Sequence, residues 1–219
     1  MKISILIPTL NVGDSIAKAV DSVVSQGAEC VVLDALSTDG TAEIARQHGA
    51  VVYEGKDSGM YEALNKGVHL ATGEVLGWVG GDDWLLPGSI ERVAQNMADG
   101  TKWMYGQCEI WKNGRIDHIA GMGLATQEEE SSANRIPAPA VFYRKDFVEE
   151  MGMFDETLKL AGDYEMWLRF YTRANPKYVP VRLAAFGITG KNRSEVDPRI
   201  HVEDRAIKEK YAYLRNHIS

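Results

Sequence analysis

The chain of 219 residues has few cysteines, no basic stretch and no long apolar run, and each shortage excludes a class of protein. Cys30 and Cys108 are too few and too far apart for a disulfide framework or a zinc site, so we expect both to be small buried apolar side chains. The formal net charge is -7, and no lysine-arginine stripe interleaves with aromatic residues, which argues against a nucleic-acid binder. An anionic substrate must therefore be received by a metal ion or by local cations.

No apolar run approaches the roughly 18 residues that cross a bilayer. The stretch MKISILIPTL soon reaches Pro8 and Asn11 without the small-residue cleavage pattern of a signal peptide, so it is expected to be a first strand. With 45% hydrophobic and 25% charged residues, the composition is that of a globular protein. We therefore expect a cytoplasmic protein with a real core.

The first hundred residues alternate strand-like and helix-like patterns. The runs ISILIP, ECVVLD, AVVYEG and EVLGWV have the character of buried strands. Between them lie helical patterns at residues 16–24, 41–48 and 60–71, and Pro87 is expected to open a further helix that ends at Gly100. This alternation predicts an α/β fold with a Rossmann-like, mostly parallel sheet flanked by helices.

After residue 100 the pattern changes. KWMYGQCEIW and RIDHIA are expected to form an antiparallel hairpin joined at Asn113-Gly114, and residues 121–136 are expected to be irregular and polar. A strand AVFYR, a helix near 146–151, a strong helix carrying Tyr164 and Trp167, and a terminal helix near 200–217 complete the chain. We expect a small antiparallel part in this half and a single domain over residues 1–219.

Several polar residues follow the predicted strands. Ligands of open α/β sheets bind outside the carboxyl ends of the strands, so these residues should share one rim. They are Thr9, Asn11, Asp34, Asp57, Asp82 and Asp83. A single acidic residue after a strand is often only a turn former, and we interpret Asp39 in STDGT in that way.

Asp82 and Asp83 are adjacent carboxylates that directly follow an apolar strand and two glycines. Two such charges repel each other, and a divalent cation would compensate them. Mg2+ and Mn2+ take oxygen ligands and often keep only one or two protein carboxylates, completing the shell with water and phosphate oxygens. The alternative is that the pair merely starts the turn into the next helix.

Five motifs, taken together and in order, resemble those of family 2 glycosyltransferases over about residues 3–172. They are SILIPTLN, VVLDALSTDGT, KDSGMYEALNKG, GEVLGWVGGDDW and AGDYEMWLRF. The resemblance implies a nucleotide-diphosphosugar transferase fold of the A type and transfer of a sugar to an acceptor hydroxyl with inversion. It also implies that residues 1–100 bind the nucleotide-sugar and the metal, whereas residues 101–219 bind the acceptor and supply the catalytic base.

The resemblance assigns donor binding to residues of the N-terminal half, namely Pro8, Thr9, Asn11, Asp34, Asp57, Lys66 and Asp82. Asp34 is expected to meet the base, because a carboxylate accepts a hydrogen bond from uracil N3-H but repels the N3 acceptor of cytosine. Thymine carries the same N3-H, so a dTDP-sugar stays open. Lys66 is expected at the phosphates, with simple surface solvation as the alternative.

The resemblance places Asp82 and Asp83 in the family's metal motif, although Gly80 and Gly81 leave no literal Asp-x-Asp arrangement. The expected cofactor is Mn2+ or Mg2+, with Asp83 on the metal and Asp82 on the metal, the ribose or a supporting contact. Asp163 matches the general base, and the start of its helix favours an ionised carboxylate. A plain N-cap is the structural alternative for Asp163, and Glu165 is the alternative base.

The tail FGITGKNRSEVDPR lacks the spacing of a Walker A phosphate loop. Lys191 and Arg193 are interpreted either as a lid over the diphosphate or as solvated loop charges. His201 is a further candidate for the metal shell, with a solvated helix surface as the alternative, because a lone histidine on a polar helix is seldom a ligand.

The leading hypothesis is a metal-dependent inverting glycosyltransferase of the hexosyl- or N-acetylhexosaminyl-transferase class. Its partners would be a UDP-sugar donor and a saccharide or lipid-linked saccharide acceptor in polysaccharide or glycolipid synthesis. Any membrane contact would be peripheral, at the inner face and through the acceptor. One alternative is an inactive sugar-nucleotide-binding module. The other is a sugar-nucleotide pyrophosphorylase, against which the lack of a glycine-rich loop with arginine and lysine after the first strand counts.

Overall fold

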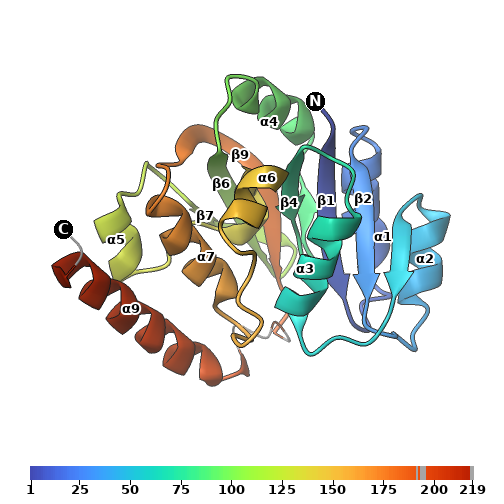
Figure 1. Ribbon diagram of the computed structural model, residues 1–219. Helices are drawn as coiled ribbons and strands as arrows, with labels where there is room; N and C mark the ends of the chain where they lie inside the picture. Colours follow the sequence, from blue (N-terminus) through green and yellow to red (C-terminus); the bar gives the residue numbers. More distant parts are fainter. Residues whose placement is uncertain (191, 193–195, 218–219) are drawn as a thin grey trace.

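The computed structural model describes residues 1–190, 192 and 196–217, with side chains as far as residue 212. A nine-stranded sheet lies between helices on both faces, with strand order β3-β2-β1-β4-β8-β6-β9-β5 and β7 paired to β6 (Figure 1). The predicted α/β class is confirmed.

The N-terminal half is the predicted Rossmann-like part, in which every strand pairs in parallel with its neighbour. Its strands are β1 (Ile3–Thr9), β2 (Glu29–Asp34), β3 (Val51–Glu54) and β4 (Val75–Trp78). The connecting helices are α1 (Ile16–Val24), α2 (Thr41–Gln47) and α3 (Met60–Leu70). Parallel connections of this kind bring the carboxyl ends of the strands to one edge of the sheet.

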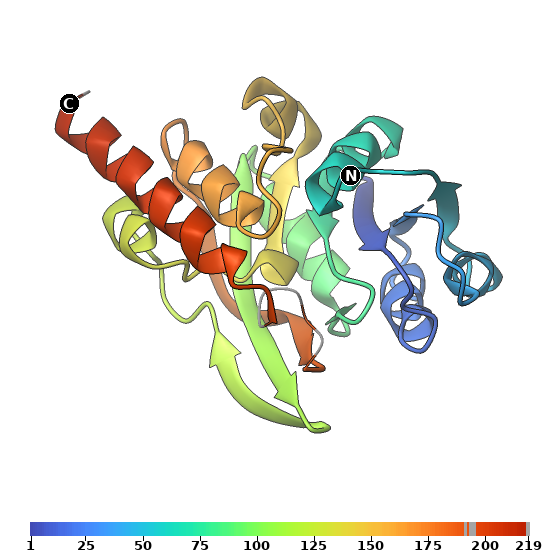
Figure 2. The ribbon, with the colours of Figure 1, turned by 90° about the horizontal axis from the view of Figure 1, so that it is seen from below.

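The remaining strands carry the antiparallel pairs and one parallel pair, that of β6 with β9. They are β5 (Trp84–Leu85), which precedes residue 100, and, in the C-terminal half, β6 (Trp103–Lys112), β7 (Arg115–Ala120), β8 (Val141–Arg144) and β9 (Lys177–Ile188). The predicted hairpin is confirmed: β6 and β7 are antiparallel, and the turn at Asn113 and Gly114 has φ values of 52° and 74°. Figure 2 shows this hairpin extending away from the helices.

Two apolar clusters cover the two faces of the sheet. One joins α1 and α2 to α4 (Ser89–Met97), and the other joins α3 to α6 (Lys145–Glu150) and α7 (Gly162–Tyr171). A third, smaller cluster packs the terminal helix α9 (Arg199–His217) against α7. Cys30 and Cys108 are buried free thiols, as predicted.

One strand was not predicted, and two local expectations are wrong. Strand β9 was not anticipated, because Pro180 in its sequence is a residue that interior strands seldom tolerate. Residues 121–136 are not wholly irregular, since α5 (Gln127–Ser132) begins there with a capping box formed by Thr126 and Glu129. Helix α4 begins at Ser89 and not at Pro87, because Gly88 between them has a left-handed φ of 78°.

A 3-10 turn (Ala138–Ala140) leads into β8. Within the part of the chain that the structure describes, no helix is both long and apolar enough to span a membrane.

Candidate active site

The ends of β1 and β2 hold the residues expected to meet the nucleoside. Thr9 and Asp34 are partners in the parallel register, and the Thr9 hydroxyl donates to Asp34 Oδ1 at 3.1 Å. Asp34 is only 1% exposed, and its carboxylate also accepts from the backbone N-H and the hydroxyl of Ser37, at 2.8 and 2.6 Å. These donors fix the orientation of the carboxylate.

Asn11 ties the two loops that follow β1 and β2. Its side-chain oxygen accepts from the backbone N-H of Thr38 at 2.9 Å, and its own N-H donates to the Ser37 hydroxyl at 2.8 Å. Asn11 has a left-handed φ of 53°, which asparagine tolerates better than most residues. Pro8 lies in β1 one residue before Thr9 and is half-buried. The structure therefore brings these residues to one edge of the sheet.

Asp57 lies just before α3, and Lys66 lies within that helix. Asp57 Oδ1 accepts from the backbone N-H of Gly59 at 3.0 Å, just before the helix begins. The Lys66 ammonium lies 2.6 Å from Glu62 Oε1 and donates to the Lys56 carbonyl at 2.9 Å, on a side chain that is 47% exposed. Lys66 is thus engaged by its own helix and the preceding loop.

Asp82 and Asp83 follow β4 and are held by backbone and amide groups. Asp83 is 3% exposed, and its oxygens accept from the N-H groups of Gly187 and Gly80, at 3.0 and 3.1 Å. Asp82 Oδ2 accepts from the Asn192 side-chain amide at 3.2 Å. A Cβ at Gly80 would lie 2.9 Å from both Asp82 Oδ1 and Asp83 Oδ2. The two carboxylates therefore converge over a position that only glycine leaves open.

The charge of this pair is not compensated by any ion pair among the described residues. Burial, and then the neighbouring charge of Asp82, raises the pKa of Asp83, and burial also raises the pKa of Asp82. Two converging carboxylate oxygens suit a hard divalent cation such as Mg2+ or Mn2+. Over the described ranges no group of three histidine, cysteine or acidic residues gathers, so an ion here would need further oxygens from water and substrate.

Asp163 is the second residue of α7, and Ala161 is the N-cap, so Asp163 is not the N-cap. The Tyr61 hydroxyl donates to Asp163 Oδ1 at 3.2 Å. Burial raises the pKa of Asp163 to about 6, and the Tyr164 N-H and the Tyr61 hydroxyl limit the rise. A Cβ at Gly162 would lie 2.7 Å from the Tyr61 ring, so glycine before Asp163 permits this contact. A partly buried carboxyl with such a pKa suits proton transfer near neutral pH.

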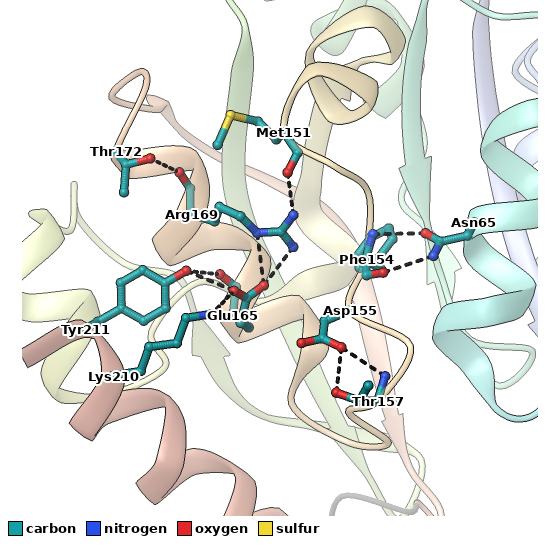
Figure 3. Close-up of polar contacts among 10 residues, drawn as sticks. All are labelled: Asn65, Met151, Phe154, Asp155, Thr157, Glu165, Arg169, Thr172, Lys210 and Tyr211. Carbon is teal, nitrogen blue, oxygen red and sulfur yellow. Dashed lines mark hydrogen bonds and ion pairs between the residues drawn. The ribbon is translucent and has the colours of Figure 1, made fainter. Parts of the chain in front are cut away.

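Glu165, the alternative base, is bound by Arg169 of its own helix and by Lys210 and Tyr211 of α9 (Figure 3). Its carboxylate lies 2.7 Å from the Arg169 guanidinium and 2.9 Å from the Lys210 ammonium, and it accepts from the Tyr211 hydroxyl at 2.9 Å. Burial would raise the pKa of Glu165, but Arg169 and Lys210 overcome this and hold it below its ordinary value. Glu165 is therefore an ion-pair partner that joins α7 to α9.

Three contacts of the site were not anticipated from the sequence. Tyr61 was expected only in the core, and it is indeed 1% exposed, yet its hydroxyl reaches Asp163. Gly187 and Asn192, in and after β9, reach Asp83 and Asp82 across more than a hundred residues of sequence. A strand prediction over residues 177–188 would have been the only signal for them.

The remaining candidates add little. Lys191 and Arg193 lie outside the described residues. His201 is exposed on α9 and belongs to no metal-binding group of the described residues.

Comparison with known proteins agrees with this architecture. The family described as Glycosyl transferase family 2 matches residues 4–150. The "PGL/p-HBAD biosynthesis glycosyltransferase" of Mycobacterium bovis (strain BCG / Pasteur 1173P2) is 28% identical over 203 residues, which cover 85% of this chain and 77% of that protein.

Two solved structures share the fold. S. aureus TarS 1-349 in complex with UDP-GlcNAc has a TM-score of 0.79 at 17% identity, over 96% of this chain and 66% of that chain. Glucosyl-3-phosphoglycerate synthase from Mycobacterium tuberculosis, in complex with Mn2+, UDP-glucose and phosphoglyceric acid, has a TM-score of 0.70 at 15% identity, over 94% of this chain and 79% of that chain. Because the family match covers more than half of the residues, the chain belongs to glycosyl transferase family 2, and it is a glycosyltransferase with the A-type fold.

Proposed function

We propose that the chain is a metal-dependent, inverting glycosyltransferase that moves a hexosyl or N-acetylhexosaminyl group from a UDP-sugar to an acceptor hydroxyl. The acceptor would be a saccharide or a lipid-linked saccharide in polysaccharide or glycolipid synthesis. The whole of residues 1–219 would act as one domain, with the donor in the half before residue 100 and the acceptor and base in the half after it.

The convergence of Asp82 and Asp83 over Gly80 carries this proposal. Burying two adjacent carboxylates costs free energy unless a cation compensates them. A bound Mn2+ or Mg2+ would neutralise the donor diphosphate as it leaves, and Asp83, with Asp82 beside it, would hold the ion. The related fold of glucosyl-3-phosphoglycerate synthase, which was solved with Mn2+ and UDP-glucose, supports this assignment.

A uracil nucleotide is favoured by the setting of Asp34. Its carboxylate is held by Thr9 and Ser37, so it presents a fixed acceptor for the N3-H of the base. TarS, which has a related fold and was solved with UDP-GlcNAc, supports a UDP-sugar as the donor. Pro8, Asn11, Asp57, Lys66 and Asp82 would complete the donor site.

Asp163 would be the general base. The acceptor oxygen would attack the anomeric carbon opposite the leaving diphosphate while Asp163 takes the proton of that hydroxyl. The bond between the anomeric carbon and the diphosphate oxygen breaks in the same step, which inverts the configuration. The Tyr61 hydroxyl would orient Asp163 and stabilise its ionised form.

The test compares UDP affinity with Mn2+ and with EDTA, by calorimetry, in the parent and in the Asp83→Ala variant. We expect the parent to bind UDP more tightly with Mn2+, and saturation at a hundredfold the Kd to add about 2.7 kcal/mol to the free energy of unfolding. Asp83→Ala should lose most of the metal response, whereas Asp146→Ala, an exposed aspartate on α6, should keep it. Equal affinity with Mn2+ and with EDTA in the parent would refute the metal site.

A further inference from the structure

The terminal helix α9 lies along the outer side of α7, the helix that carries Asp163 (Figures 1 and 2). A cluster of apolar side chains from both helices, including Tyr164, Leu168, Ile207 and Tyr211, fills the contact between them. The family match ends at residue 150, so both helices lie outside it. What α9 does for Asp163 must therefore be read from the contacts of this chain.

Glu203 of α9 binds the chain just before α7 begins. Its Oε1 accepts from the backbone N-H of Lys159, and its Oε2 accepts from those of Leu160 and Ala161, each at 2.9 Å. Ala161 is the N-cap of α7 and has no side-chain group that could cap the helix. One carboxylate from another helix thus binds three backbone donors at this helix start.

A second contact lies one turn further along α7. Lys210 and Tyr211 of α9 both reach the Glu165 carboxylate, each at 2.9 Å (Figure 3). Asp163 lies between this contact and the segment held by Glu203. Helix α9 therefore holds α7 on both sides of the proposed base.

The chain that leads into α7 also contacts α3 and the loop before it. Lys159 Nζ donates to the Ser58 carbonyl at 3.1 Å, and the Asn65 side chain pairs with both backbone groups of Phe154 at 2.9 Å (Figure 3). Helix α3 is also the helix whose Tyr61 donates to Asp163. The position of Asp163 relative to Tyr61 thus depends on residues 154–161, which contact α3 and its preceding loop at Phe154 and Lys159 and contact α9 at residues 159–161.

We propose that Glu203 is a positioning residue, which holds residues 159–161 so that the Asp163 carboxylate stays against Tyr61 and faces the acceptor hydroxyl. This inference rests on the proposed role of Asp163 as the general base. In this role Glu203 contacts neither donor nor acceptor, because both oxygens of its carboxylate accept hydrogen bonds from backbone N-H groups. Misplacement of a catalytic group by about 1 Å can cost a hundredfold in rate, so such a residue affects turnover more than binding.

The pH profile separates positioning from general stabilisation. Asp163 meets the Tyr61 hydroxyl from α3, while acidic charges influence it from two packed helices, Asp204 on α9 and Glu130 on α5. If Glu203 releases the start of α7, water reaches Asp163 and the Tyr61 hydrogen bond weakens. Burial affects the pKa of Asp163 more than that hydrogen bond does, so the pKa falls from about 6 toward the ordinary value of an aspartate. The acid limb of the pH profile, where turnover falls because the base becomes protonated, should then move to lower pH, and maximal turnover should fall. A residue that only stabilises the fold would leave the limb in place.

The experiment compares Glu203→Ala, Glu203→Gln and Glu209→Ala in the full chain. Glu209 is an exposed glutamate on the same helix and serves as the matched control. Turnover is measured as nucleotide release with Mn2+, using whichever of UDP-glucose, UDP-GlcNAc and GDP-mannose the parent cleaves fastest. Calorimetry gives the affinity for the nucleotide product, and amide hydrogen exchange reports on Leu160 and Ala161.

We expect Glu203→Ala to lower maximal turnover by about tenfold to a hundredfold, to shift the acid limb to lower pH and to speed exchange at Leu160 and Ala161. Nucleotide affinity should stay within about twofold of the parent, because the donor edge is untouched. Glu203→Gln keeps one accepting oxygen and should recover part of the loss. Glu209→Ala should match the parent in every measurement.

An unchanged pH profile and turnover in Glu203→Ala, at equal folded fraction, would overturn the inference. So would a loss of turnover that only follows a loss of folded protein. If the alanine variant does not fold, the glutamine variant decides by the same criteria. The Asp163→Asn variant separates the two proposals: full activity in that variant refutes the general base, whereas loss there combined with full activity in Glu203→Ala refutes the positioning role alone.

Discussion

Glu165 on α7 and Asp83 after β4 are both 3% exposed, yet their surroundings are electrostatically opposite. Glu165 has two cationic partners, Arg169 and Lys210, and its pKa lies below the ordinary value although burial opposes this. Among the described residues Asp83 has backbone N-H partners and an acidic neighbour, and burial raises its pKa.

The difference separates a carboxylate that belongs to the fold from one that awaits a ligand. A buried charge is costly unless it is paired, and the fold itself pairs Glu165. Asp83 must gain its counter-charge from outside or bind a proton. Asp163 is of the second kind, because the Tyr61 hydroxyl and the Tyr164 backbone N-H that it accepts from are both neutral.

The largest expected effect tests Asp163. Asp163→Asn keeps the size of the side chain but removes the basic oxygen, so turnover should fall by roughly a hundred- to ten-thousandfold. UDP affinity should survive, because no donor contact is assigned to Asp163. Metal-dependent release of UDP from a UDP-sugar at saturating donor gives the readout. Turnover equal to that of the parent, at matched folded fraction, would show that Asp163 is a structural residue. Glu165 would then be the candidate base.

Asp34 extends the comparison to a carboxylate that is hydrogen-bonded but carries no cationic partner among the described residues. Asp34→Ala should weaken the binding of UDP by about 1.5–3 kcal/mol, the range for a hydrogen bond to a charged group. It should also reduce the difference in affinity between UDP and CDP, because the proposed acceptor for the N3-H of uracil is gone. Calorimetry with both nucleotides measures this difference. Undiminished discrimination would show that another group reads the base.

Neutralising Glu165 and neutralising Asp83 should change the free energy of unfolding in opposite directions. In metal-free protein at pH 7, Glu165→Gln should lower the free energy of unfolding by about 1–2 kcal/mol, less than a fully buried pair because Lys210 is half-exposed. Asp83→Asn should raise the free energy of unfolding. The pKa of Asp83 is higher in the folded than in the unfolded protein, so this residue destabilises the fold increasingly as the pH rises from the unfolded-state pKa to the folded-state pKa, and asparagine removes that effect. Urea unfolding measures both. Destabilisation by both variants would contradict the comparison.

The smallest expected effect concerns Tyr61. Turnover should have an acid limb near pH 6, because the base works only when ionised. Tyr61→Phe removes a donor that stabilises the ionised carboxylate, so the limb should move to higher pH by about one unit or less. Tyr53→Phe, at an exposed tyrosine of β3, is the matched control and should leave the limb in place. A limb that stays fixed in Tyr61→Phe would remove Tyr61 from the site.

Much of the fold could be predicted because its signals are local. The apolar runs of β1 to β4, the helical spacing in α1 and the Asn113-Gly114 turn each lie within a short window of sequence. Strand β9 could not be read in the same way, because Pro180 and its half-buried positions hide the alternation, and its pairing with β6 is long-range. The position of Asp82 and Asp83 at a strand end was therefore predictable, but their contacts with Gly187 and Asn192 were not.

The sequence by itself determined the α/β alternation, the polar rim after the parallel strands and the acidic residues that could act there, because periodicity and strand ends are local properties. Only the tertiary structure decided which acids are compensated. Asp163 and Glu165 are two residues apart on one helix, yet one meets Tyr61, 102 residues away, and the other meets Lys210, 45 residues away. Burial and charge pairing depend on which elements pack together, so the same side-chain chemistry becomes a candidate base toward α3 and an ion-pair anchor toward α9.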